Sequence, residues 1–175
     1  MRLLLGVMLF ISSQVGAITL TSGAKRDLRL GLSVGQLIED KVGATTRTVV
    51  GPLFRYEFAI KPSLSLGIHA AYRYGKNERS LHQFVYGLVI QHYLNDRESN
   101  LPLYVSYGLL MQVMKLGDVK GGGTAHDTRL ALGFDFTLLE SPHFFETAYN
   151  YSRLHYFNEN QRNLDHWEFA YGVRF

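Results

Sequence analysis

The chain has 175 residues, no cysteine and a formal net charge of only +3, with acids and bases interspersed. The lack of cysteine excludes a disulfide framework and a thiolate metal site. A mild net charge without a basic block gives no indication of nucleic-acid binding. A chain of this length fits one domain after a short leader. We expect no metal and no cofactor, because the histidines lack the spacing of a motif such as HExxH.

The first 17 residues have the pattern of a secretory signal peptide. Arg2 supplies the positive charge of the n-region, and Leu3 to Ile11 form a continuous apolar run. Val15-Gly16-Ala17 ends on a small residue suited to cleavage. The alternative is a transmembrane helix, but that needs about 20 apolar residues. We therefore expect residues 1–17 to be a cleaved signal peptide and residues 18–175 to form the mature domain of an exported protein.

The rest of the chain is a series of segments in which apolar residues alternate with polar or small ones. This period of two predicts β-strands whose two faces meet different surroundings. The segments are 27–36, 50–60, 64–74, 82–93, 103–113, 128–136, 145–151 and 165–175. An even number of segments, each of about ten residues, suits the strands of a transmembrane barrel. In the fourth segment Val85 and Val89 fall on the polar face, so its register is the least certain.

The last segment shows the alternation most clearly. Trp167, Phe169, Tyr171, Val173 and Phe175 share one face, and the chain ends on that face. In a soluble sandwich this face would cover a core, whereas in a membrane barrel it would contact lipid. Aromatic residues near the ends of the apolar faces suit the aromatic girdles of a membrane barrel. They include Tyr56, Tyr72, Tyr74, Tyr107, Tyr149 and Trp167.

Charged residues within the segments fall on the polar face. They are Arg29, Arg55, Glu57, Arg73, Arg129, Asp135, Glu146, Glu168 and Arg174. A charge that faced hydrocarbon at mid-depth would cost roughly 2–4 kcal/mol. Gly and Ala share the same face, as a narrow interior requires. We therefore predict an all-β fold, an eight-stranded antiparallel up-and-down transmembrane β-barrel, whose interior is plugged by these paired charges.

Strand direction then fixes which connections share an end of the barrel. With a periplasmic N-terminus, connections 37–48, 75–80, 115–126 and 158–164 face outward, and 61–63, 94–100 and 138–143 are periplasmic turns. Outer loops are usually the longer ones, and the first and third outer connections are the longest of all. Cations in the outer loops suit either lipopolysaccharide phosphates or an ordinary solvated rim. They are Lys41, Arg47, Lys76, Arg79, Lys115, Lys120 and Arg162.

The C-terminal sequence Tyr171-Gly172-Val173-Arg174-Phe175, together with the alternating segments, resembles the small outer-membrane barrels of the OmpX, OmpA-barrel and OmpW kind. The resemblance covers the whole mature chain. It implies a monomer in the outer membrane of a Gram-negative bacterium, in contact with outer-membrane lipids and lipopolysaccharide. It also implies recognition by the outer-membrane barrel assembly machinery, with Phe169, Tyr171 and Phe175 as the assembly signal.

The enzymatic alternative is a faint resemblance to the PagL lipid A deacylase family, which carries a His-x-Ser-Asn motif on its seventh strand and a downstream Glu. Ser152 matches the serine, but Asn150 stands at the histidine position and Arg153 follows the serine. Without an imidazole, no base takes the serine proton. Asp165 or Glu168 would be the acid. His155 falls on the face opposite Ser152, which makes it a weak candidate base.

His166 and Glu168 share a face, and we expect them to form a hydrogen-bonded pair in the interior rather than an acid–base pair for catalysis. The sequence thus predicts a porin-like outer-membrane barrel without enzymatic activity, in a structural or surface-interaction role. The alternatives are a deacylase-like barrel and a narrow OmpW-type channel for small apolar solutes.

Overall fold

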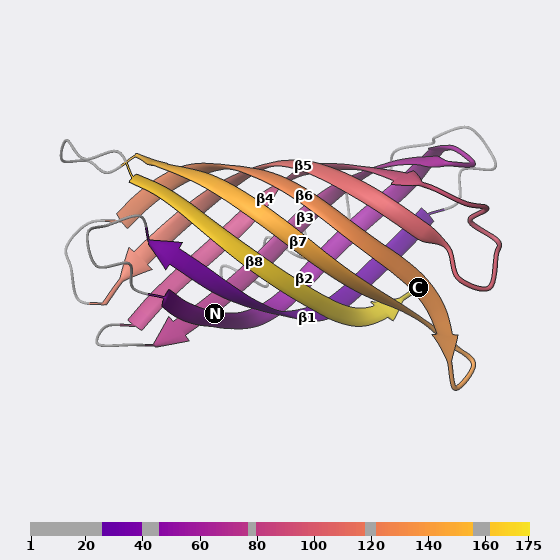
Figure 1. The fold of residues 1–175 in the computed structure, drawn as a ribbon, viewed down its shortest axis with the longest axis horizontal. Helices are drawn as coiled ribbons and strands as arrows, with labels where there is room; N and C mark the ends of the chain where they lie inside the picture. The colour runs from indigo at the N-terminus through magenta and orange to yellow at the C-terminus, as the bar shows by residue number, and fades with distance from the viewer. Residues whose placement is uncertain (1–25, 40–45, 77–79, 118–121, 156–161) are drawn as a thin grey trace, which may run out of the picture.

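The computed structural model describes residues 26–39, 46–76, 80–117, 122–155 and 162–175. The predicted signal peptide lies outside this part of the chain. Eight antiparallel strands form a closed barrel, in which each strand pairs with the next and β8 pairs with β1 (Figure 1). The strands are β1 (Arg26–Glu39), β2 (Thr46–Lys61), β3 (Leu64–Lys76), β4 (Ser80–Tyr93), β5 (Leu103–Leu116), β6 (Gly122–Leu138), β7 (Ser141–His155) and β8 (Arg162–Arg174). The predicted eight-stranded antiparallel barrel is confirmed.

The strands extend beyond the segments predicted from alternation. Residues 122–126, predicted as part of a loop, belong to β6, and Pro142, predicted in a turn, lies in β7 opposite Thr137. The turn itself is reduced to Leu139 and Glu140, both with positive φ. The prediction was wrong here because alternation marks where a strand borders an apolar phase, whereas backbone pairing continues into the polar region beyond it.

The pairing register explains the steep tilt of the strands (Figure 1). Successive partners around the barrel are Arg29, Arg55, His69, Gly87, Leu110, Asp127, Ser152, Leu164 and Glu39. The circuit thus returns to β1 ten positions further along, from 29 to 39. Such a stagger requires strands inclined to the barrel axis, and with this number of strands the interior holds side chains and little else.

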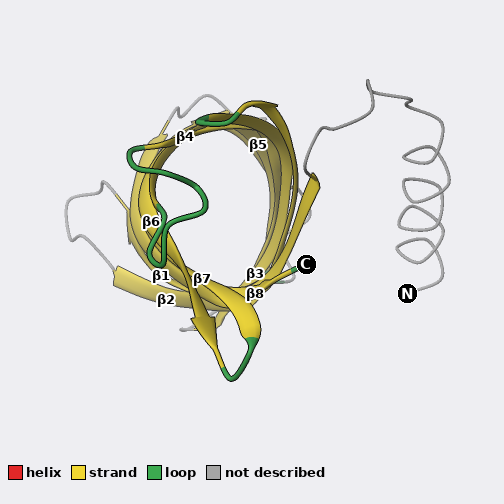
Figure 2. Cartoon of the chain, turned by 90° about the vertical axis from the view of Figure 1, so that its right-hand side faces the viewer, coloured by secondary structure: helices red, strands yellow, loops and turns green. Residues whose placement is uncertain are grey.

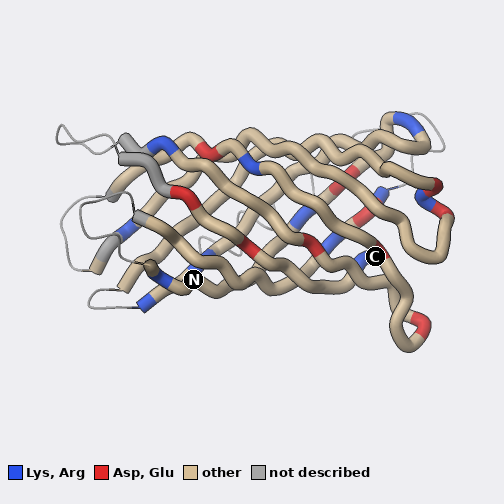
Figure 3. Tube along the Cα trace, in the orientation of Figure 1, with Lys and Arg blue, Asp and Glu red and all other residues tan. Residues whose placement is uncertain are grey.

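The outward face of the barrel is an apolar belt. Leu130 and Leu132 on β6 are each 54% exposed, and Trp167 and Phe169 on β8 are 51% and 54% exposed. Charged residues occur along the whole length of the barrel as well as at its ends (Figure 3). Those in its middle have buried side chains, so they face inward. The described residues include no helix that is long and apolar enough to cross a membrane.

Aromatic side chains gather near both edges of the belt. At one edge the rings of Tyr149 and Trp167 lie 5.2 Å apart, centroid to centroid. Near the same edge the Tyr72 hydroxyl and His82 Nδ1 are 2.6 Å apart. At the other edge His143 stacks on Tyr171, with ring centroids 5.5 Å apart. This distribution is the one expected of aromatic girdles at two membrane interfaces.

Strand β4 has a regular register despite its blurred alternation. Its pairing with β3 and with β5 is continuous over the length of the strand. Val85 and Val89 face inward, where they form an apolar cluster with Ala71 and Leu110. The alternation is blurred because this wall of the interior is apolar.

The longest connection, by the bounds of the described strands, is residues 94–102 between β4 and β5. The expectation that the first and third outer loops are the longest is therefore wrong, because the strands beside those loops continue into them. Asn95 fixes the β4–β5 connection: its Nδ2 donates to the Leu101 carbonyl at 2.9 Å, and its Oδ1 accepts from the Leu103 amide at 2.6 Å. Figure 2 shows this connection projecting over one side of the barrel opening.

Inward-facing glycines make room for large neighbours, and Gly133 is the clearest case. A Cβ at this position would overlap the ring and hydroxyl of Tyr104. We expect Gly133→Ala to displace that ring and to lower the free energy of unfolding by about 1–3 kcal/mol. Urea unfolding in lipid vesicles measures the loss. The matched control is Gly108→Ala, where the nearest atoms would be 3.3 Å away; equal losses in the two variants would contradict the explanation.

Candidate functional site

The dominant feature of the interior is an unbroken chain of ion pairs with alternating charge. It contains the charged residues predicted to face inward, and we call it the interior charge chain. In order it runs Arg174, Asp135, Arg29, Glu57, Arg55, Glu146, Arg129, Glu168 and Arg73. The side chain of Arg174, at one end, is 23% exposed, and all the others are at most 4% exposed. The interior charge chain therefore cross-links opposite walls of the barrel.

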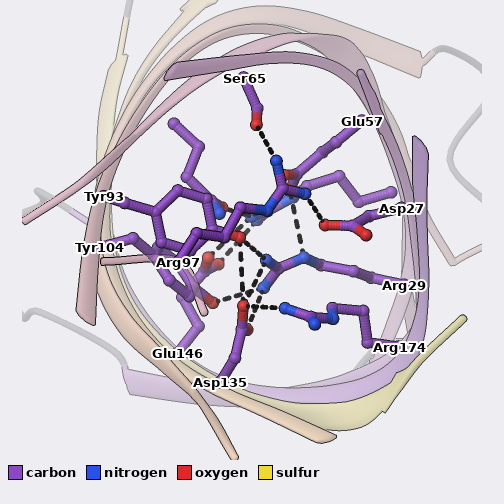
Figure 4. Close-up of polar contacts among 12 residues, drawn as sticks. Asp27, Arg29, Glu57, Ser65, Tyr93, Arg97, Tyr104, Asp135, Glu146 and Arg174 are labelled. Atoms are coloured by element: carbon purple, nitrogen blue, oxygen red, sulfur yellow. Dashed lines mark hydrogen bonds and ion pairs between the residues drawn. The ribbon is translucent and has the colours of Figure 1, made fainter. Parts of the chain in front are cut away.

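Arg29 organises the half of the interior charge chain nearest the chain termini (Figure 4). Its guanidinium donates to both carboxylate oxygens of Asp135, at 2.9 and 3.1 Å, and its Nε lies 3.2 Å from Glu57. The same group lies over the Tyr104 ring, 4.8 Å from the centroid, and donates to the Tyr93 hydroxyl at 3.0 Å. It also lies 5.4 Å from the centroid of the Phe144 ring. This buried cation thus has two acids and three aromatic neighbours, which offset much of the cost of removing it from water.

Two glutamates hold the middle of the interior charge chain. Glu146 accepts a bidentate pair of hydrogen bonds from Arg55, both at 2.8 Å, and also binds Arg129. Glu168 accepts from Arg73 at 3.1 and 2.8 Å and from Arg129 at 3.0 Å. Each glutamate is therefore shared by two arginines. Burying an unpaired charge at this depth would be unfavourable in free energy. Each charge is therefore stabilised only while its neighbours of opposite sign are present.

Buried side chains occupy both ends of the described interior. At the end away from the chain termini there is a buried apolar cluster; it consists of Leu37, Val49, Leu81, Met114 and Ala125. At the other end Arg97, from the β4–β5 connection, turns inward. It forms an ion pair with Asp27, donates to Ser65 Oγ at 3.4 Å and lies over the Tyr93 ring at 5.0 Å from the centroid. Arg97 was not predicted, because a charge in a turn looks like an ordinary solvated residue.

We expect Arg97→Ala to loosen this end of the barrel. Loss of a partly buried charged hydrogen bond lowers the free energy of unfolding by about 1–3 kcal/mol, and the amides of residues 94–102 should exchange faster with solvent. The matched variants are Asp27→Ala and the double variant. If Arg97 and Asp27 form a direct pair, the double variant should have a free energy of unfolding no lower than that of either single variant. Strictly additive losses would show that the two residues act independently.

The candidate catalytic residues Ser152 and Glu168 are both buried inside the barrel. Ser152 is fully buried on the inward face of β7, opposite Asp127 of β6, where a membrane lipid has no access. Glu168 is bound by arginines. The predicted hydrogen bond between His166 and Glu168 is not formed, because both ring nitrogens of His166 lack a partner. The side chain of His155 lies outside the described part. Among the described residues, no cluster of His, Asp and Glu could hold a metal ion.

The residues of the predicted assembly signal lie on the outward-facing side of β8. Phe169, Tyr171 and Phe175 are 54%, 46% and 67% exposed. The backbone of Phe175 also exchanges two hydrogen bonds with Leu28 of β1, at 2.8 and 3.0 Å. The last residue of the chain therefore helps to join β8 to β1.

No protein-family model and no curated protein sequence matches the chain. Solved structures do match it. Neisserial surface protein A (NspA) has a TM-score of 0.67 at 14% identity, over 87% of this chain and 98% of that one. The outer membrane enzyme PagL has a TM-score of 0.59 at 10% identity, over 81% and 98%. Ail, the attachment invasion locus protein of Yersinia pestis, has a TM-score of 0.57 at 14% identity, over 88% and 100%. The chain thus has the fold of the eight-stranded outer-membrane barrels.

Proposed function

We propose that this protein is a monomeric integral outer-membrane β-barrel with a plugged interior, acting as a structural or surface-interaction protein through its outer end. The observation that carries the proposal is the interior charge chain. Because the interior charge chain cross-links opposite walls, and because buried side chains occupy both ends of the described interior, the barrel leaves no wide path for solutes. It can display residues at its outer end.

The outward face supports the membrane location. An apolar belt edged by aromatic residues matches the hydrocarbon region and its two interfaces. The proposed export signal and the exposed terminal aromatics are consistent with delivery to the outer membrane and recognition by the barrel assembly machinery. Two proteins with this fold are named as a surface protein and as an attachment invasion locus protein, which agrees with a surface role.

Two experiments test the proposal. The first is planar-bilayer recording of the refolded barrel. The second is mass spectrometry of lipid A from cells that express the protein and from cells that lack it. We expect no stable conductance steps, because charged side chains fill the interior, and an unchanged lipid A mass, because Ser152 is out of reach. Reproducible single-channel steps would support the narrow channel instead. Loss of one acyl chain, abolished by Ser152→Ala, would support a deacylase.

A further inference from the structure

One arginine on the inward face of the barrel lies outside the interior charge chain. Arg47 was predicted to lie in an outer loop, but it belongs to β2, and its cross-strand partner on β1 is the buried Leu37. The Nε and Nη1 atoms of Arg47 are buried and have no hydrogen-bond partner. A guanidinium group is always charged and has only donors, so burying it unpaired is unfavourable. The position therefore suits an acceptor that comes from outside the chain.

The fold holds the Arg47 side chain against the inner wall. Gly75 of β3 is buried, and a Cβ at this position would lie 3.1 Å from Arg47 Cδ and 2.9 Å from Val49 Cγ1. The absence of a side chain at Gly75 thus makes room for the aliphatic part of Arg47. The guanidinium group is positioned by this packing and does not extend freely into solvent.

The surroundings of Arg47 are apolar. It lies beside the apolar cluster at the end of the interior away from the chain termini, and we call this end the distal mouth. Leu37, the partner of Arg47, belongs to the cluster, and so does Val49, two residues further along β2. Leu81, another member, is the cross-strand partner of Gly75. The distal mouth therefore combines a cation with an apolar floor.

This combination defines the kind of ligand that fits. A guanidinium group binds a carboxylate through charge-assisted hydrogen bonds, and apolar side chains favour an apolar partner. On β6 the inward-facing acid nearest to the cluster is Asp127, which lies two positions deeper in the barrel than Ala125 of the cluster. A purely apolar solute would leave Arg47 unpaired, and an inorganic anion would make no use of the apolar floor.

We propose that the distal mouth binds a small organic anion with an apolar body. Arg47 donates to the anionic group through Nε and Nη1, and the apolar body packs on Leu37, Val49 and Leu81. The ligand stays at the distal mouth, because the interior charge chain fills the barrel below it. Since Arg47 faces inward, this site is separate from the surface that contacts lipid.

The test is binding of phenylbutyrate to the purified full-length protein in lipid nanodiscs, followed by the NMR chemical shifts of the Gly75 and Leu81 amides. The comparison compounds are butyrate, which lacks the aromatic ring, and phenylbutanol, which lacks the charge. The variants are Arg47→Gln and the control Lys76→Ala, an exposed cation next to Gly75 on β3. The heat-dependent gel mobility of each variant shows that the barrel has folded.

We expect phenylbutyrate to shift both amides in a saturable way, and Arg47→Gln to weaken its binding roughly tenfold or more, because charge-assisted hydrogen bonds are lost. Butyrate and phenylbutanol should each bind the wild type roughly tenfold more weakly than phenylbutyrate does, and Lys76→Ala should bind phenylbutyrate as the wild type does.

Three results would overturn the proposal. Absence of saturable shifts, or equal binding by Arg47→Gln, would overturn the site itself. Equal binding of butyrate would overturn the role of the apolar floor, and equal binding of phenylbutanol would overturn the role of the charge. Planar-bilayer recording measures the plugged interior separately, so failure of the proposed function is distinguished from failure of this site.

Discussion

Replacing Glu146 by alanine is expected to lower the free energy of unfolding by about 3–5 kcal/mol, because removal of one partner leaves buried charges uncompensated. Glu146 is the link between Arg55 and Arg129, both of which are fully buried. Without it, two guanidinium groups face one another across a dry interior. Urea unfolding of the barrel in lipid vesicles, followed by tryptophan fluorescence, measures the loss.

A compensating variant separates this explanation from simple loss of packing. Combining Glu146→Gln with Arg129→Met removes one charge of each sign. The remaining arginines keep acidic partners, because Arg55 still contacts Glu57 and Arg73 still contacts Glu168. We expect the double variant to be more stable than Glu146→Gln alone. A double variant less stable than either single one would contradict the charge argument, and Lys61→Ala, at an exposed position, serves as a neutral control.

Introducing an arginine at Leu132 is expected to lower the free energy of unfolding in lipid by about 2–4 kcal/mol, the cost of a cation at mid-depth on the lipid face of a barrel. Leu132 is 54% exposed at the middle of the β6 outward face. In a water-soluble barrel the same change would be close to neutral, because an exposed leucine would already face solvent.

The matched control is Leu139→Arg. Leu139 is 91% exposed in the β6–β7 turn, beyond the belt, so the same substitution should change stability by less than about 0.5 kcal/mol. Leu132→Ala separates the cost of the charge from that of the lost side chain. Similar effects of arginine at positions 132 and 139 would contradict a lipid environment around β6.

The sequence allowed the strands and their faces to be predicted, because a period of two survives wherever one face meets an apolar phase and the other does not. It did not allow the partners within the interior charge chain to be predicted. Arg73 and Glu168 are 95 positions apart, and their meeting depends on the stagger of the whole barrel. A slip of two residues in any strand would keep every charge inside yet change its partner.

Other features escaped prediction for local reasons. Val85 and Val89 blurred the pattern of β4 because part of the interior is apolar. Arg97 lies in a connection, where alternation carries no information about burial.

The central claim, that lipid surrounds a plugged barrel, is tested most directly on β6. Since the chain has no cysteine, single cysteines at Leu132 and at Ala131 can each carry a spin label in the barrel reconstituted in lipid vesicles. The label at position 132 should collide readily with oxygen, which concentrates in lipid, and little with a water-soluble nickel chelate. The label at position 131, which faces the interior, should be poorly accessible to both. A label at position 132 that prefers the nickel chelate would contradict the membrane location, and a label at position 131 that is freely accessible to the chelate would contradict the plugged interior.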